Sequence, residues 1–154
     1  MGWLETYRGT VFRWEVDHND HLTVAYYFSR IADAGAWLLG AVGLAAAGAR
    51  TADCFVRYQR ELRVGDIMHM ESGVTSVELD ALVLGHKLFD SGAGALCTTV
   101  EQRVRLAHWL AAEEDAKRDA WLTDKACAGT TPVRPSGREN WGLGRDNRRA
   151  AADV

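Results

Sequence analysis

A chain of 154 residues with 47% hydrophobic and 25% charged residues has the size and composition of one globular domain. A formal net charge of −3 argues against an extended nucleic-acid or anionic-membrane surface, because such partners usually select for clustered Lys and Arg. No signal-peptide pattern opens the chain, and the three widely spaced cysteines (Cys54, Cys97 and Cys127) are typical of buried thiols in a reducing compartment, so we expect a cytoplasmic protein.

The first predicted elements are a strand and a long helix. Residues 6–16 combine β-branched and aromatic side chains, which favours a strand. Over residues 24–42 apolar side chains return at helical spacing, which predicts an amphipathic helix that stops near Gly43. Gly35 and Gly40 lie inside it, where glycine costs about 1 kcal/mol relative to alanine, so we expect close approach to another part of the chain. Three polar residues of the segment are predicted to lie outside the apolar face: Ser29, Arg30 and Asp33.

Strand patterns dominate the rest of the domain. Four further strands are predicted over residues 54–63, 67–78, 81–90 and 95–106, the last three joined by short hairpin connections. The order of one strand, one long helix and then strands predicts an α+β domain, with the helix lying across a curved antiparallel sheet.

The C-terminal part differs in composition. Residues 113–125 read as a short helix, and from residue 128 onward Gly, Pro and Arg become frequent, which predicts an extended or disordered tail. We therefore divide the chain into a single domain over residues 1–127 and a tail over residues 128–154.

A dense group of polar side chains, Asp-His-Asn-Asp-His at residues 17–21, lies between the first strand and the helix. A carboxylate there can be partly desolvated, which would raise its pKa and its basicity. The start of a helix also offers unpaired backbone N–H groups that can stabilise an oxyanion. A base beside an oxyanion site is the minimum that hydrolysis of an acyl group requires.

Three interpretations of this segment remain open at this point. In the first, Asn19 or Asp20 merely caps the helix and the histidines are solvated. In the second, His18 and His21 bind a metal together with an aspartate, although no further His or Cys cluster lies nearby in the sequence. In the third, Asp17 performs metal-free acid–base chemistry.

The run from Trp14 to Tyr27 resembles the signature of hot-dog fold thioesterases of the 4-hydroxybenzoyl-CoA type. That signature has a catalytic Asp, two residues, Gly-His, an apolar residue, and then a small residue and a Tyr on the helix. Its residues are matched here by Asp17, His21, Leu22, Ala25 and Tyr27. Residues 55–62 and the turn at 64–66 are similar to the second strand of the family and the turn after it. Asp20 departs from the family Gly, and Thr23 from a frequent Asn; Asp tolerates the backbone conformations of a turn better than most residues do.

The resemblance implies a hot-dog fold that hydrolyses a small acyl-CoA, nearest to enzymes for acyl groups of the carnitine and betaine type. Asp17 would attack the thioester carbonyl or activate a water, and backbone N–H groups of Thr23, Val24 and Ala25 would hold the oxyanion. It further implies a homodimer or homotetramer with the site between subunits, and no metal or cofactor besides the coenzyme A of the substrate. The substrate-binding candidates are Asn19, His21, Arg57, Tyr58 and His86.

Two alternatives to this activity remain. One is a protein of the same fold that binds acyl-CoA without catalysis. The other is an enoyl-CoA hydratase of the same fold, whose Asp-x-Asn-Pro-x-His pattern is matched at Asp17 and Asn19. Asp20 stands in place of its Pro and His21 comes one residue early, which turns the imidazole by about 100° at a helix start.

Overall fold

The computed structural model describes residues 2–44, 46–78 and 81–106. It contains five strands, one α-helix and one short 3-10 helix: β1 (Leu4–Thr10), η1 (Arg13–Glu15), α1 (Val24–Ala41), β2 (Ala49–Tyr58), β3 (Ile67–Val77), β4 (Leu82–Asp90) and β5 (Ala95–Leu106). The predicted helix over residues 113–125 and the predicted tail over residues 128–154 lie outside the described residues. No helix within the described ranges has the length and apolar character that a membrane span requires.

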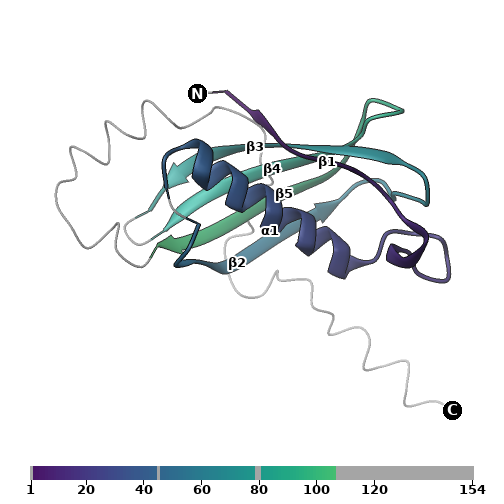
Figure 1. The fold of residues 1–154 in the computed structure, drawn as a ribbon, viewed down its shortest axis with the longest axis horizontal. Coiled ribbons are helices and arrows are strands. Elements are labelled where there is room, and N and C mark those ends of the chain that lie inside the picture. The colour runs from purple at the N-terminus through teal and green to yellow at the C-terminus, as the bar shows by residue number, and fades with distance from the viewer. Residues whose placement is uncertain (1, 45, 79–80, 107–154) are drawn as a thin grey trace, which may run out of the picture.

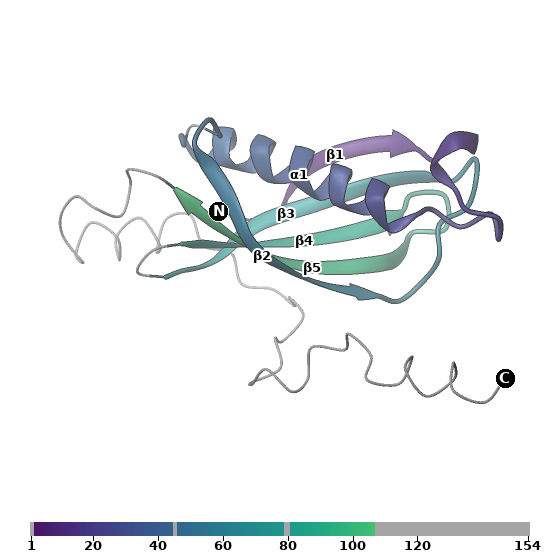
Figure 2. The same cartoon turned by 90° about the horizontal axis from the view of Figure 1, so that it is seen from below.

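The strands form one antiparallel sheet in the order β1-β3-β4-β5-β2. The helix α1 lies diagonally across this sheet (Figure 1), and the view turned by 90° shows that it covers one face (Figure 2). The predicted α+β architecture and the hairpins that link β3, β4 and β5 are confirmed. The chain leaves α1 to form β2 at the far edge of the sheet, where it pairs with β5.

The first strand is shorter than the sequence pattern predicts. β1 ends at Thr10 rather than at residue 16, and the chain then turns into η1. The backbone N–H of Phe12 donates to the Glu15 carboxylate (3.0 Å) instead of continuing a ladder with β3. The Glu15 carboxylate therefore stabilises the turn that ends β1.

The second predicted strand is shifted along the chain. β2 begins at Ala49, which pairs with Leu106, and ends at Tyr58 rather than at residue 63. After Tyr58 the N–H groups of Gln59 and Arg60 both donate to the carbonyl of Cys97 (2.8 and 3.1 Å), so the regular ladder stops there.

The helix follows the predicted apolar face with three exceptions. Its stop near Gly43 is confirmed, since this residue has a φ of +82° in the left-handed region. Val24 and Phe28, which belong to the apolar side chains at helical spacing, are exposed. Arg30, predicted to lie off the apolar face, is buried, because residue 30 follows Tyr27 by three positions and therefore shares its side of the helix.

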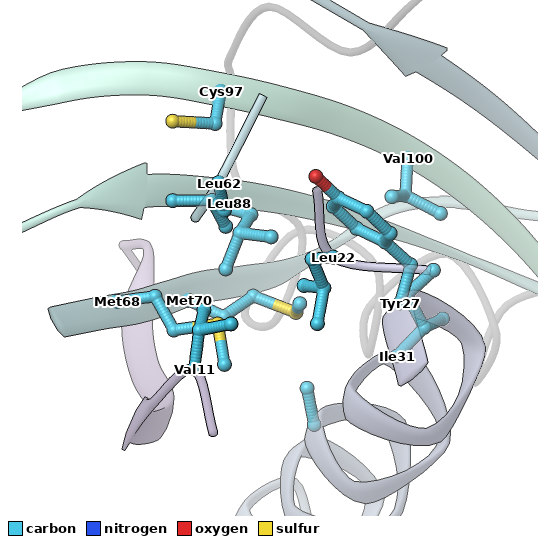
Figure 3. Packing of buried hydrophobic residues seen from close by; sticks show 11 residues of the cluster. Val11, Leu22, Tyr27, Ile31, Leu62, Met68, Met70, Leu88, Cys97 and Val100 are labelled. Carbon is cyan, nitrogen blue, oxygen red and sulfur yellow. The ribbon is translucent and has the colours of Figure 1, made fainter. Parts of the chain in front are cut away.

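Two clusters of buried apolar side chains fill the space between α1 and the sheet. The first lies toward the start of the helix (Figure 3) and consists of Val11, Leu22, Tyr27, Ile31, Ala34, Leu62, Met68, Met70, Leu88, Cys97 and Val100. The second lies toward its end and consists of Leu38, Leu39, Val42, Val74, Leu82, Leu84 and Val104. Burying a side chain such as Leu22 stabilises the fold by about 1.5–3 kcal/mol, so the first cluster anchors the chain just before α1.

A chain of polar side chains crosses the sheet between these apolar groups, with one member on each strand. It runs from Thr6 to Ser72 (2.6 Å), from Ser72 to Nδ1 of His86 (2.6 Å), from Nε2 of His86 to Gln102 (3.0 Å), and from Gln102 to Thr51 (2.8 Å). With His86 neutral and its proton on Nε2, the Ser72 hydroxyl can donate to Nδ1 and the ring N–H can donate to Oε1 of Gln102. We call these residues the buried polar chain.

Candidate active site

Residues 17–21 form a tight loop between η1 and α1. Val16 and Leu22 form an isolated antiparallel bridge at its base. Within the loop, the N–H of Asp17 donates to the carbonyl of His21 (2.9 Å), and the N–H of Asp20 donates to the carbonyl of Asp17 (3.1 Å). Asp20 has a φ of +67°, the left-handed conformation that glycine adopts most easily. Asp20 therefore adopts a turn conformation of the kind that Asp tolerates better than most residues do.

The carboxylate of Asp17 is exposed and accepts two backbone N–H groups. One of its oxygens, Oδ1, accepts from Asn19 (2.8 Å) and from His21 (3.1 Å). These bonds, the one from His21 first, hold the pKa of Asp17 below its usual range, and the charges of the two nearby imidazoles act in the same direction. The predicted upward shift by desolvation is therefore wrong, because the amides outweigh the small burial. Asp17 is ionised at neutral pH.

The start of α1 supplies fewer free amides than predicted. Thr23 is the N-cap, but its own N–H donates to the carbonyl of Glu15 (2.9 Å) and cannot serve an oxyanion. From Tyr26 onward the N–H groups bind carbonyls of the helix, beginning with that of Thr23 (3.0 Å). The amides of Val24 and Ala25 are the first-turn donors that have no backbone acceptor among the described residues. Of the three predicted oxyanion donors, only the amides of Val24 and Ala25 therefore remain candidates.

The capping and metal interpretations of the loop receive no support. The Asn19 side chain is exposed, and the Asp20 carboxylate accepts from Arg13 (2.7 Å), so neither caps α1. In the part of the chain that the structure describes, no three His, Cys, Asp or Glu side chains gather as a metal site would require.

Two of the predicted substrate-binding residues, Arg57 and Tyr58, lie exposed at the end of the edge strand β2. The Tyr58 ring packs edge-on against the ring of Tyr27 in the first turn of α1, with 5.0 Å between centroids. Tyr27 points from the helix into the first apolar cluster (Figure 3), where burial raises its pKa to about 12, so its hydroxyl stays protonated. That hydroxyl is buried without a hydrogen-bond partner in the described residues. Tyr58 thus packs against the first turn of α1.

His86, also predicted to bind substrate, cannot do so. Its side chain is 0% exposed on β4, and both ring nitrogens are engaged in the buried polar chain. Burial lowers the pKa of His86 to about 4. The sequence prediction failed because a strand pattern does not tell which face of a buried strand meets the helix.

Two residues of the site were missed by the sequence pattern. Arg30 and Glu15 form an ion pair that is buried between η1 and α1. The spacing of Arg30 from Tyr27 was a usable signal for the helix side, since residues three apart share a face. Nothing in the sequence identifies Glu15 as its partner.

The family model of the thioesterase-like superfamily matches residues 11–108. Among proteins with curated descriptions, none matches the chain in sequence. Solved structures resemble it closely in fold. A putative thioesterase from Pseudomonas putida KT2440 is 22% identical, with a TM-score of 0.66 over 88% of this chain and 99% of the other. A hypothetical protein from Staphylococcus aureus, solved in complex with CoA, is 20% identical, with a TM-score of 0.63 over 88% of this chain and 92% of the other.

A more distant structure has a named substrate. It is a 1,4-dihydroxy-2-naphthoyl-CoA thioesterase from Synechocystis, 11% identical, with a TM-score of 0.59 over 68% of this chain and 81% of the other. The matches confirm the hot-dog fold, and the family model covers the loop, α1 and all strands from β2 to β5. The chain therefore belongs to the thioesterase-like superfamily and is a thioester hydrolase.

Proposed function

We propose that the chain is an acyl-CoA thioesterase of the 4-hydroxybenzoyl-CoA type in which Asp17 is the catalytic carboxylate. The observation that carries the proposal is the setting of this carboxylate. One oxygen is fixed by the amides of Asn19 and His21, and the loop closes directly onto the first turn of α1. The second oxygen has no hydrogen-bond partner among the described residues and is available to a substrate or a water.

The arrangement supports hydrolysis in the following way. Asp17 attacks the thioester carbonyl or removes a proton from the water that attacks it. The carbonyl oxygen gains negative charge and accepts from the amides of Val24 and Ala25, each worth about 3–4 kcal/mol when well placed. The carbon–sulfur bond then breaks, and the thiolate of coenzyme A leaves and takes up a proton. If water attacked, the carboxylic acid is released at this point. If Asp17 attacked, a water molecule must next hydrolyse the acyl–Asp17 anhydride, which releases the acid and restores the carboxylate. The low pKa of Asp17 keeps it in the reactive ionised form.

We further propose that coenzyme A is the thiol and that two copies of the chain complete the site along β2. A protein of similar fold holds CoA in its structure, and another is a thioesterase for an acyl-CoA. β2 lies at the edge of the sheet, and an edge strand is where a second copy can add its own strand. Arg57 and Tyr58 at its exposed end would then reach the Asp17 loop of the partner. A small acyl group is the expected cargo.

The test is release of free thiol from a panel of short-chain, aromatic and quaternary-ammonium acyl-CoAs. We expect turnover of at least one of them by the wild type, and a loss of about 10³-fold for Asp17→Asn, in the range of a lost acid–base group. Asp33→Asn, an exposed carboxylate on α1, is the matched control and should retain full activity. Turnover that survives Asp17→Asn contradicts the assignment. Binding of acyl-CoA without turnover would favour a non-catalytic binding protein.

A further inference from the structure

A buried ion pair lies directly behind the catalytic loop. Glu15 and Arg30 are 3% and 8% exposed, and their charged groups form a hydrogen-bonded pair. The guanidinium also lies over the rings of Tyr7 and Tyr26, at 5.3 and 5.9 Å from their centroids. The pair therefore connects η1 to the body of α1 in surroundings that exclude water.

Glu15 also bonds to the residue before η1 and to the N-cap of α1. Its second carboxylate oxygen accepts the N–H of Phe12 (3.0 Å), and its carbonyl accepts the N–H of Thr23 (2.9 Å), the residue that begins α1. Asp17 follows Glu15 by two residues. The side chain of Glu15 thus fixes the chain just before Asp17. Arg30 in turn holds Glu15 against α1, the helix whose first amides are the proposed oxyanion donors.

Stability alone does not account for this pair. Removing two charges from water is costly, and a packed apolar pair of similar size often stabilises a fold as well or better. Moreover, Nε of Arg30 is buried without a hydrogen-bond partner among the described residues. Unlike an apolar contact, the ion pair is directional. Its hydrogen bonds fix the rotation of η1 against α1.

We propose that the Glu15–Arg30 pair is a positioning device that holds the Asp17 carboxylate in register with the amides of Val24 and Ala25. This inference rests on the proposed function of Asp17. A displacement of about 1 Å between a catalytic group and its substrate can reduce turnover about 100-fold, so a small rotation of η1 suffices.

The test compares single and double substitutions. Glu15→Gln leaves the buried Arg30 charge unpaired and is expected to destabilise the protein strongly. Glu15→Gln/Arg30→Met removes both charges at similar volume and is expected to recover most of the stability. If the pair positions Asp17, kcat of the double variant stays reduced about 10- to 100-fold with KM within about threefold of wild type. Arg8→Gln, which breaks the exposed Arg8–Glu5 pair of β1, is the matched control and keeps wild-type kinetics.

Two outcomes overturn the proposal. One is a double variant with wild-type kcat, which shows that the pair serves stability only. The other is a double variant in which the Thr23 amide, which donates to the Glu15 carbonyl, keeps its wild-type protection against hydrogen exchange. If the pair holds η1 against α1, its removal should weaken this bond and speed the exchange. This second measurement needs no turnover, so it separates failure of the positioning role from failure of the thioesterase assignment.

Discussion

The buried polar chain and the loop at residues 17–21 both contain histidine, and they lie in opposite surroundings. In the buried polar chain, His86 has both ring nitrogens bonded and no exposed surface. In the loop, His18 and the Asp17 carboxylate are exposed. One oxygen of this carboxylate has no hydrogen-bond donor among the described residues, and the amides of Val24 and Ala25 have no backbone acceptor there. The buried polar chain therefore leaves no ring nitrogen of His86 for a ligand, whereas the loop leaves hydrogen-bonding groups that a ligand can use.

The difference shows that a strongly shifted pKa does not by itself mark a catalytic residue. His86 has the larger displacement, to about 4, because burial disfavours its charged form, yet no substrate can reach it. Asp17 is shifted downward by amides that also orient it, and it stays accessible. Convergent donors with a free reactive atom are the more useful criterion here.

The largest expected effect concerns His86 in the buried polar chain and the pH dependence of stability. The folded pKa of His86 is below its unfolded value of 6.5, so both states are neutral above pH 6.5 and the unfolded state alone gains a proton as the pH falls. The free energy of unfolding should therefore decline between pH 6.5 and about 4, by up to about 3 kcal/mol from this group. In His86→Gln this part of the decline should be absent. Urea unfolding at several pH values measures the difference.

Histidine removal elsewhere gives the control for that experiment. His18→Gln deletes an exposed imidazole from the loop and shows how much of the change follows from losing any histidine. Carboxylates that titrate in the same interval contribute alike to wild type and His86→Gln and cancel between them, whereas in His18→Gln the pKa of Asp17 loses the lowering effect of the His18 charge. Parallel pH profiles for wild type and His86→Gln would show that the buried polar chain does not keep His86 neutral.

A second prediction concerns the contact between α1 and the buried polar chain. A Cβ added at Gly35 would lie 2.7 Å from Oε1 of Gln102, so the amide must move and its bond to His86 is lost. A buried donor left unpaired costs about 1–3 kcal/mol, more than the roughly 1 kcal/mol that alanine adds to helix propensity. A Cβ added at Gly40 meets no atom of the described residues within 4 Å, so Gly40→Ala should stabilise the protein. We expect a difference of about 2 kcal/mol between the two variants in chemical denaturation. Equal stabilities would mean that Gln102 repacks freely.

The sequence predicted the fold better than it predicted the site. Periodicity placed α1 and the hairpins β3, β4 and β5, because burial repeats at fixed spacing in helices and strands. It placed the ends of β1 and β2 wrongly, since these depend on single contacts such as the Glu15 carboxylate on the Phe12 amide. Such contacts join residues whose spacing carries no period.

The site was predictable only where it is local. The five residues at 17–21 lie together in sequence and in space, so composition and resemblance could single them out as the candidate site. The occupied amide of Thr23 and the burial of Arg30 depend on partners that only the folded chain brings near. His86 was misplaced for the converse reason. As a polar residue on a strand it looked exposed, but the buried polar chain gives it partners inside the sheet.

The smallest expected effect concerns the backbone conformation of Asp20 in the loop. Asp20 holds a φ of +67°, whereas the buried polar chain lies on regular strands, so the backbone of the loop depends on residue type in a way that the strands do not. Alanine tolerates this conformation less well than asparagine, so Asp20→Ala should be about 1 kcal/mol less stable than Asp20→Asn. Asp20→Gly should equal or exceed the Asn variant, because relief at φ offsets the loss of the exposed Arg13 pair. Asp33→Ala on the exposed side of α1 is the control, since alanine there should stabilise. Thermal unfolding ranks the variants, and an alanine at position 20 as stable as asparagine would show that the loop relaxes to another conformation.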